Sequence, residues 1–279
     1  MSDLIDAVIR TRKIAEQIAI KSLEDIAGIS EAGLRDKIIS EVKNHTEIFS
    51  EGYYSPPPLG IGVIFNEKPF DRFKYDSLRN PDFWPKENSH FKQETVGMVY
   101  FSPVDRKTGM IGDIGFTFYL GDSEEIKQHI KNCYSAILDV AKHAEVGMTF
   151  SGLCSFASSH FANKFKMTKL TASNSDPNQS INLGHTIPGS FEKDFVFGDT
   201  FEKVKETITK NRVPFIDTEN FEIPQTCAFT VESRLEDLNN PNLPSVYFHF
   251  IVCFNKGEKT ILENFDEIFT AVGMDYMKS

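Results

Sequence analysis

The sequence is poor in several features that would define a class of protein. It has one Trp and seven His, and none of its cysteines forms a Cys-x-x-Cys pair, so neither a disulfide framework nor a zinc finger is predicted. No Gly-x-Gly-x-x-Gly loop is present, no apolar run is long enough to span a bilayer, and no basic, then apolar segment opens the chain. These absences favour a cytoplasmic protein with buried thiols, which are Cys133, Cys154, Cys227 and Cys253.

Positive charge is also scarce. The formal net charge is −10, which argues against nucleic acid or an anionic membrane as a partner, because both attract basic surfaces. The apolar content of 40% and the charged content of 25% are those of a globular protein. No low-complexity linker interrupts the 279 residues, so a single domain covering 1–279 is predicted.

Phenylalanine is abundant, with 25 residues, and most of these rings are expected in the core. Apolar spacing predicts helices paired with antiparallel strands, which is an α+β protein. A polar, aperiodic stretch at 66–96 and another at 171–180 are expected to be loops. Helices are predicted at about 3–22, 30–43, 122–145, 150–165, 200–211 and from 264, and strands at 59–65, 97–102, 111–120, 226–234, 245–254 and 259–262.

Three short stretches carry residue types that bind metal ions. They are the segment 109–121 with Asp113, the segment 184–192 with His185 and Glu192, and the segment 228–232 with Glu232. One imidazole and two carboxylates from distant segments suit one divalent cation. Taken singly, each of these residues is more often a turn, core or surface residue, so the functional interpretation depends on their combination.

Several motifs, in this order along the chain, resemble the methionine aminopeptidase/creatinase superfamily. The motifs are Ile9-Arg-Thr-Arg-Lys-Ile-Ala-Glu, Asn66-Glu67, the segment 97–121, Val146-Gly-Met-Thr149 and the segment 247–257. This resemblance implies the pita-bread fold, in which two pseudo-symmetric α+β halves surround a central cleft.

The resemblance also implies a metal site that is incomplete. Catalytic members hold two metal ions with five residues, of which Asp113, His185 and Glu232 match the ligands. Ser102 and Phe248 fall on the two other ligand positions, and Phe248 cannot coordinate. Both are expected to line the substrate pocket instead, with Phe248 giving an apolar end to it.

Two further positions correspond to histidines of the superfamily. Glu192 falls on a substrate-binding histidine and could act as a fourth ligand or as the general base. The other histidine falls on Asp71 when counted from Asn66, and His90 is the nearest histidine before the hairpin, so His90 is the candidate proton shuttle. His249 is expected to be structural.

These residues together favour an enzyme that uses one divalent metal ion, Fe, Mn, Co or Zn, for hydrolysis or lysis. The expected substrate is a small amino-acid-derived or aromatic molecule, or a short peptide. Two alternatives stay open: a catalytically inactive peptidase-like binding module, and a metal-free hydrolase of C–N bonds that resembles creatinase. The sequence leaves open whether the protein is a monomer or a homodimer, and whether the segment 192–222 acts as a lid.

Overall fold

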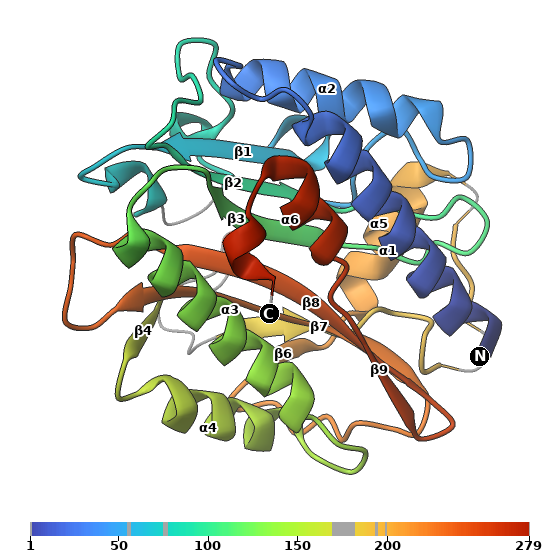
Figure 1. The fold of residues 1–279 in the computed structure, drawn as a ribbon. Helices are drawn as coiled ribbons and strands as arrows, with labels where there is room; N and C mark the ends of the chain where they lie inside the picture. Colours follow the sequence, from blue (N-terminus) through green and yellow to red (C-terminus); the bar gives the residue numbers. More distant parts are fainter. Residues whose placement is uncertain are drawn as a thin grey trace.

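A curved antiparallel sheet runs through the middle of the molecule. The computed structural model describes residues 2–54, 57–74, 78–168, 182–192, 195–198 and 200–278. The sheet has seven strands in the order β1-β2-β3-β8-β7-β4, with β9 paired to β8 (Figure 1). The strands of this sheet are β1 (Ile61–Asn66), β2 (Val96–Phe101), β3 (Ile114–Tyr119), β4 (Phe165–Thr168), β7 (Cys227–Asp237), β8 (Val246–Asn255) and β9 (Glu258–Leu262).

Helices cover one face of this sheet. Side chains such as Ser30, Ser123 and Thr149 accept hydrogen bonds from the first turns of three helices and fix where these helices begin. In Figure 1 the helices lie in front of the strands. They are α1 (Ser2–Leu23), α2 (Glu31–Asn44), α3 (Glu124–His143), α4 (Phe150–Phe161) and α6 (Asp266–Val272).

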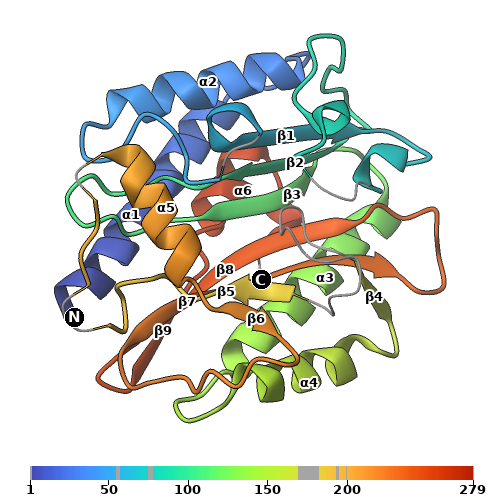
Figure 2. The same cartoon turned by 180° about the vertical axis from the view of Figure 1, so that it is seen from behind.

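The opposite face of the sheet carries a smaller layer. Figure 2 shows α5 (Phe201–Asn211) and the two-stranded sheet of β5 (Asn182–His185) and β6 (Pro214–Ile216) in front of the main strands. A β-bridge between Thr186 and Phe229 joins this layer to β7. The layer therefore lies across the centre of the curved sheet.

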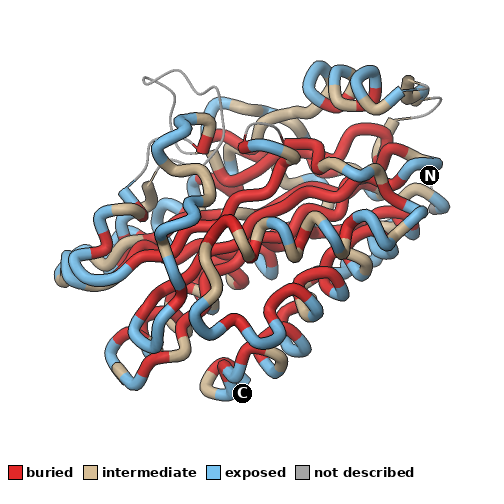
Figure 3. The backbone as a smooth tube through the Cα atoms, turned by 90° about the horizontal axis from the view of Figure 1, so that it is seen from above, coloured by how far each residue is buried: buried red, intermediate tan, exposed pale blue. Residues whose placement is uncertain are grey.

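The chain divides into two α+β halves, as the resemblance implies. The first half places α1 and α2 against β1, β2 and β3, and the second places α3 and α4 against β7, β8 and β4. The sheet is buried along most of its length, as the red strands in Figure 3 show. Many of its rings are phenylalanines, which confirms the prediction that most of them are core residues.

The observed elements agree with the predicted helices and long strands to within a few residues. The sequence did not predict the short strands β4, β5 and β6. The stretch 66–96 contains the short helical turns η2 (Asp71–Phe73) and η3 (Pro81–Phe83) and is otherwise irregular where it is described. The predicted loop at 171–180 lies outside the described residues. Among the residues that are described, no helix combines the length and apolar character needed to cross a membrane.

Candidate functional site

Asp113 lies at the entry to β3 with its carboxylate fully buried. Neither of its oxygens has a hydrogen-bond partner among the described residues. Gly112 permits this position, since a Cβ there would lie 2.3 Å from a backbone carbon of Thr11 in α1. Burial, and then the negative charge of Glu232, raise the pKa of Asp113 to about 8.

Glu232 and His249 face each other across the β7–β8 pair. They are direct partners in the antiparallel register, and their nearest atoms, Glu232 Oε2 and His249 Nε2, are 3.9 Å apart. The Tyr247 hydroxyl donates a hydrogen bond of 2.6 Å to Glu232 Oε2. Burial raises the pKa of Glu232 to about 7, and burial followed by the charge of Arg12 lowers the pKa of His249 well below its ordinary value.

His185 ends β5 and enters the same cluster from the opposite layer. Its backbone N–H donates to Thr230 Oγ1 at 2.9 Å, and Gly184 allows this approach because a Cβ there would lie 2.3 Å from the same oxygen. The ring Nδ1 lies 2.9 Å from the carbonyl oxygen of Thr186. A carbonyl only accepts, so Nδ1 carries the proton and Nε2 presents its lone pair to Asp113 Oδ2 at 3.7 Å.

The three predicted ligands, Asp113, His185 and Glu232, therefore lie together, and His249 joins them. His249 Nε2 is 3.7 Å from Asp113 Oδ2, and neither of its ring nitrogens has a hydrogen-bond partner in the described part of the chain. Burial, and next the charge of Arg212, lower the pKa of His185 to about 3. Both histidines are thus neutral near pH 7, so these contacts are not ion pairs.

The structure corrects the assignment of Phe248. Its ring packs on the helical face of the sheet, with centroids 5.0 Å from Tyr134, 5.5 Å from Phe265 and 6.3 Å from Phe269. Side chains alternate along a strand, so the neighbouring His249 faces the cluster instead. The prediction that Phe248 forms an apolar end of the substrate pocket is therefore wrong. His249, which was expected to be structural, instead lies beside Asp113 and Glu232.

Ser102 is fully buried just after β2. Its Oγ accepts a hydrogen bond of 3.0 Å from the backbone N–H of Tyr54. It also contacts the Tyr100 side chain, whose pKa is raised well above its ordinary value by burial and then by the charges of Asp113 and Glu232. Ser102 therefore reaches the cluster through Tyr100.

Neither of the two predicted catalytic residues shares a hydrogen bond or an ion pair with the cluster within the described residues. Glu192 Oε2 accepts a hydrogen bond of 2.8 Å from the Gly189 N–H, which holds the carboxylate within its own turn. His90 is exposed, and its Nδ1 lies 3.0 Å from the carbonyl oxygen of Gly28. His90 is bridged to Ser30 at the start of α2, away from the cluster, so the proton-shuttle role predicted for it is wrong.

Arg12 is a site residue that the sequence analysis did not find. This fully buried side chain of α1 donates hydrogen bonds to the carbonyl oxygens of Asp113, His249 and Glu263, the latter two at 2.9 and 2.8 Å. Burial lowers the pKa of Arg12 to about 9, which leaves it charged at neutral pH. It thereby fixes the backbone beneath two members of the cluster.

Tyrosines and arginines surround the cluster. The ring centroids of Tyr100 and His249 are 6.3 Å apart, and those of Tyr53 and His185 are 6.5 Å apart. Arg212, which follows α5, lies over the Tyr53 ring at 5.9 Å. Burial is the largest effect on Asp113 and Glu232 and raises their pKa values, and the positive charge of Arg212 partly offsets this rise.

The donor set fits a divalent cation in its chemistry. Two ligands that each lie about 2.1 Å from one ion are separated by no more than about 4.2 Å, and the separations of 3.7 and 3.9 Å fall within this limit. The buried and unpaired atoms of Asp113 and His249 are those that an ion would engage. As placed, however, no group of three or more His, Cys, Asp or Glu among the residues described could hold a metal ion, so side-chain shifts would be required.

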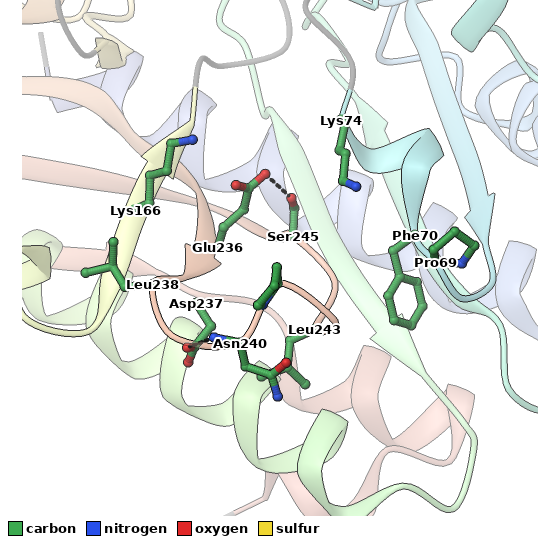
Figure 4. A pocket seen from close by; sticks show the side chains of 11 residues that line it. Pro69, Phe70, Lys74, Lys166, Glu236, Asp237, Leu238, Asn240, Leu243 and Ser245 are labelled. Atoms are coloured by element: carbon green, nitrogen blue, oxygen red, sulfur yellow. Dashed lines mark hydrogen bonds between the residues drawn. The ribbon is translucent and has the colours of Figure 1, made fainter.

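A separate small pocket of about 230 Å³ lies near the turn between β7 and β8. Figure 4 shows Lys166 and Lys74 on opposite sides of it, with the Glu236 carboxylate between them. Glu236 accepts a hydrogen bond of 2.9 Å from Ser245. None of the predicted site residues lines this pocket.

Comparison with solved structures identifies the architecture. X-Pro aminopeptidase from Thermotoga maritima superimposes with a TM-score of 0.62 and 14% identity, over 94% of this chain and 61% of that one. The chain has the pita-bread fold. Prolidase from Pyrococcus furiosus gives a TM-score of 0.61 and 13% identity, over 94% of this chain and 64% of that one.

A variant of Escherichia coli aminopeptidase P has the same arrangement, with a TM-score of 0.61, 12% identity and coverage of 100% of this chain and 60% of that one. This pita-bread chain thus spans roughly three fifths of the length of the structures it matches. No protein-family model matches the sequence, and no curated protein matches it. At these identities the comparison establishes the fold.

Proposed function

We propose that this pita-bread protein is a peptidase-like hydrolase that uses one divalent cation. The substrate would be a small amino-acid-derived molecule or a short peptide, cleaved at an amide or related C–N bond. The observation that carries the proposal is the convergence of Asp113, His185, Glu232 and His249 in one buried cluster with unpaired donor atoms. The solved structures with this fold include an X-Pro aminopeptidase and prolidases, which supports a peptidase-like reaction.

The cation would be held by Asp113, His185 and Glu232. His249 would be an additional ligand, since it lies in the cluster whereas Phe248, which matched the ligand position, does not. A divalent cation in such a site supplies Lewis-acid polarisation of a carbonyl group. The Thr186 carbonyl keeps the Nε2 lone pair of His185 directed at the cluster, and the Tyr247 hydroxyl orients Glu232.

The surroundings favour a substrate with a negatively charged end. Arg212 places a cation above the Tyr53 ring and near the cluster. The Arg79 guanidinium lies 5.4 Å from the centroid of the Tyr54 ring. A carboxylate of an amino-acid-derived substrate would be attracted to this side, while the buried rings of Tyr100 and Tyr247 exclude water from the cluster.

A metal-free C–N hydrolase is the second candidate. It is favoured by the carboxylate oxygens of Asp113, which are unpaired among the described residues and which a cationic group of the substrate would engage directly. In that case a cationic substrate would balance Asp113 and Glu232, whose raised pKa values reflect burial together with, for Asp113, the nearby Glu232 charge.

Elemental analysis of freshly purified protein separates the two, combined with hydrolysis of a dipeptide panel that includes X-Pro dipeptides. We expect one divalent cation per chain, lost in Asp113→Ala and reduced in His249→Leu. His129→Gln is the matched control, because His129 is a buried histidine bonded to the Pro244 carbonyl and lies outside the cluster.

Two bound cations per chain would contradict the proposal. Hydrolysis without bound metal, unaffected by a chelator, would favour the second candidate. If the protein neither binds a metal ion nor hydrolyses any substrate of the panel, a binding module becomes the better interpretation.

A further inference from the structure

A cleft of about 440 Å³ lies at the other end of β1 and β2 from the cluster. Asn66, the last residue of β1, lines it and pairs with Val96 at the start of β2. Ser102 follows the opposite end of β2, where Phe101 pairs with Ile61. The length of a strand therefore separates this cleft from the candidate active site.

Beneath the cleft, both carboxylate oxygens of Glu31 accept hydrogen bonds. This carboxylate is fully buried, and its Oε1 accepts from Phe65 N–H at 2.6 Å, Arg72 Nη1 at 2.7 Å and Ser89 Oγ at 3.0 Å. Its Oε2 accepts from the Lys86 N–H at 2.9 Å. The Glu31 charge is therefore balanced by Arg72 and satisfied by backbone and hydroxyl donors.

The second carboxylate of the cleft is engaged as well. Glu67 Oε1 lies 2.9 Å from Lys92 Nζ and accepts a longer hydrogen bond of 3.5 Å from Thr95 Oγ1. This ion pair is at the exposed rim, where the Lys92 side chain is 67% exposed and the Glu67 side chain 49%. Both carboxylates that contact the lining are thus paired with a cation.

Donors, in contrast, are in excess. Asn66 is only 5% exposed, and its Nδ2 has no hydrogen-bond partner in the described part of the structure. The same holds for Nε and Nη2 of Arg72, which form the edge of the guanidinium that faces away from Glu31. This edge is the one that makes two parallel hydrogen bonds with a carboxylate or phosphate.

Charge follows the same pattern. Arg72 is balanced by Glu31 and Lys92 by Glu67, whereas the Lys86 ammonium, also in the lining, has no ion pair among the described residues. Unpaired buried donors are stabilised by an acceptor, and the neighbouring Lys86 charge favours an acceptor that is negatively charged.

We infer that this cleft binds a small ligand bearing an oxyanion, a carboxylate or a phosphate, through Arg72, Asn66 and Lys86. The three donor atoms are buried as placed, so a small shift of the Arg72 and Asn66 side chains toward the cleft brings them to the ligand oxygens. The oxygens then accept from the Nε and Nη2 edge of Arg72 and from the Asn66 amide, and the Lys86 ammonium supplies the balancing charge. The site is independent of the proposed hydrolysis, because none of the cluster residues lines it.

Isothermal titration calorimetry with the whole chain tests this inference. Inorganic phosphate and succinate are titrated separately in a phosphate-free, low-salt buffer, with sodium chloride at matched ionic strength as the reference. We expect one saturable site for at least one of the two anions, and the anion that binds more tightly identifies the source of the oxyanion. Arg72→Lys keeps a cation beside Glu31 but loses the two-donor edge, so affinity should fall about tenfold or more.

Asn66→Asp is the second variant, because it replaces the amide donor with a negative charge, and it should weaken binding at least as much. Lys107→Met is its charge-matched control, since Lys107 is exposed in the turn between β2 and β3 and should leave the affinity unchanged. Absence of saturable binding to both anions would overturn the inference. So would unchanged affinity in folded Arg72→Lys and Asn66→Asp, with folding checked by circular dichroism.

Discussion

Replacement of Arg12 by methionine should destabilise the protein strongly although it removes a costly buried charge. Arg12 donates to three carbonyl oxygens, those of Asp113 and His249, which are buried, and that of Glu263, which is partly buried. Each carbonyl left without a donor costs about 1–3 kcal/mol, and relief of the buried charge offsets part of this. We expect Arg12→Met to lower the free energy of unfolding by about 3 kcal/mol.

Lys13→Met is the matched control for this substitution. Lys13 is the next residue of α1, and its 46% exposed side chain forms an ion pair of 2.8 Å with Glu16, whose side chain is only 4% exposed. Glu16 Oε2 keeps its hydrogen bond of 2.9 Å from Asn264 when Lys13 is replaced, so we expect Lys13→Met to cost about 1 kcal/mol. Urea unfolding followed by circular dichroism measures both variants. If Arg12→Met unfolds within about 1 kcal/mol of Lys13→Met, the proposed role of Arg12 in joining these strands is wrong.

Arg12→Met also gives a functional readout. The substitution removes the contact that fixes the backbone at Asp113 and His249, so the spacing of their side chains should change. We expect the cation content of this variant to fall at protein concentrations and temperatures where circular dichroism shows it folded, whereas Lys13→Met keeps the wild-type content. Full cation content in folded Arg12→Met would show that Arg12 serves stability alone.

Three other substitutions test packing, hydrogen bonding and titration. Gly112→Ala should lower the unfolding free energy by about 2 kcal/mol or more, because the new Cβ would lie 2.3 Å from the backbone of α1. Gly152→Ala is the control within α4: its new Cβ would lie 3.2 Å from the nearest atom, Thr149 Oγ1, so this variant should be neutral or more stable in the same urea assay. Tyr247→Phe removes the 2.6 Å donor to Glu232, so the carboxyl band of Glu232 in infrared titration should shift to a higher pKa, and an unchanged band would contradict this. Burial lowers the pKa of His129 in the folded state. Below about pH 6.5 the unfolded state therefore binds a proton at this histidine while the folded state still has it neutral. Wild type should therefore lose stability between about pH 6.5 and 5, and His129→Gln should lose less, as measured by urea unfolding at each pH.

Local sequence signals predicted most of the fold because the long elements have strong periodicity. The apolar spacing of α1 and the Ser30 cap of α2 are local features, and both helices lie where they were expected. The strands β4, β5 and β6 are three or four residues long. Strands of this length have too few residues for alternation to be recognised, and pairing with distant segments defines them.

The error at Phe248 has a specific cause. Matching a motif along the chain fixes a position only to within a residue, whereas one step along a strand reverses the face to which a side chain points. The sequence did contain the deciding signal. In Tyr247-Phe248-His249-Phe250 the phenylalanines alternate with a tyrosine and a histidine, which places His249 with the polar face.

Arg12 carried a weaker signal. It is four residues after Val8 and three before Ala15, both of which are buried, so the helical period places it on the buried face of α1. A charged side chain on such a face needs buried partners. The partners themselves, carbonyl groups 101 and 237 residues away, depend on how β3 and β8 meet and are not encoded locally.

The cluster lies where the two halves of the pita-bread fold join. Asp113 comes from the first half, whereas Glu232 and His249 come from the second, and the junction between β3 and β8 is marked by the pairing of Phe116 with Phe248. A small displacement of one half relative to the other therefore changes the 3.7 Å separation of Asp113 and His249 directly. Glu232 and His249, on neighbouring strands of one half, would keep their spacing. The buried guanidinium that bridges this junction thus controls the spacing that determines whether a cation can be held.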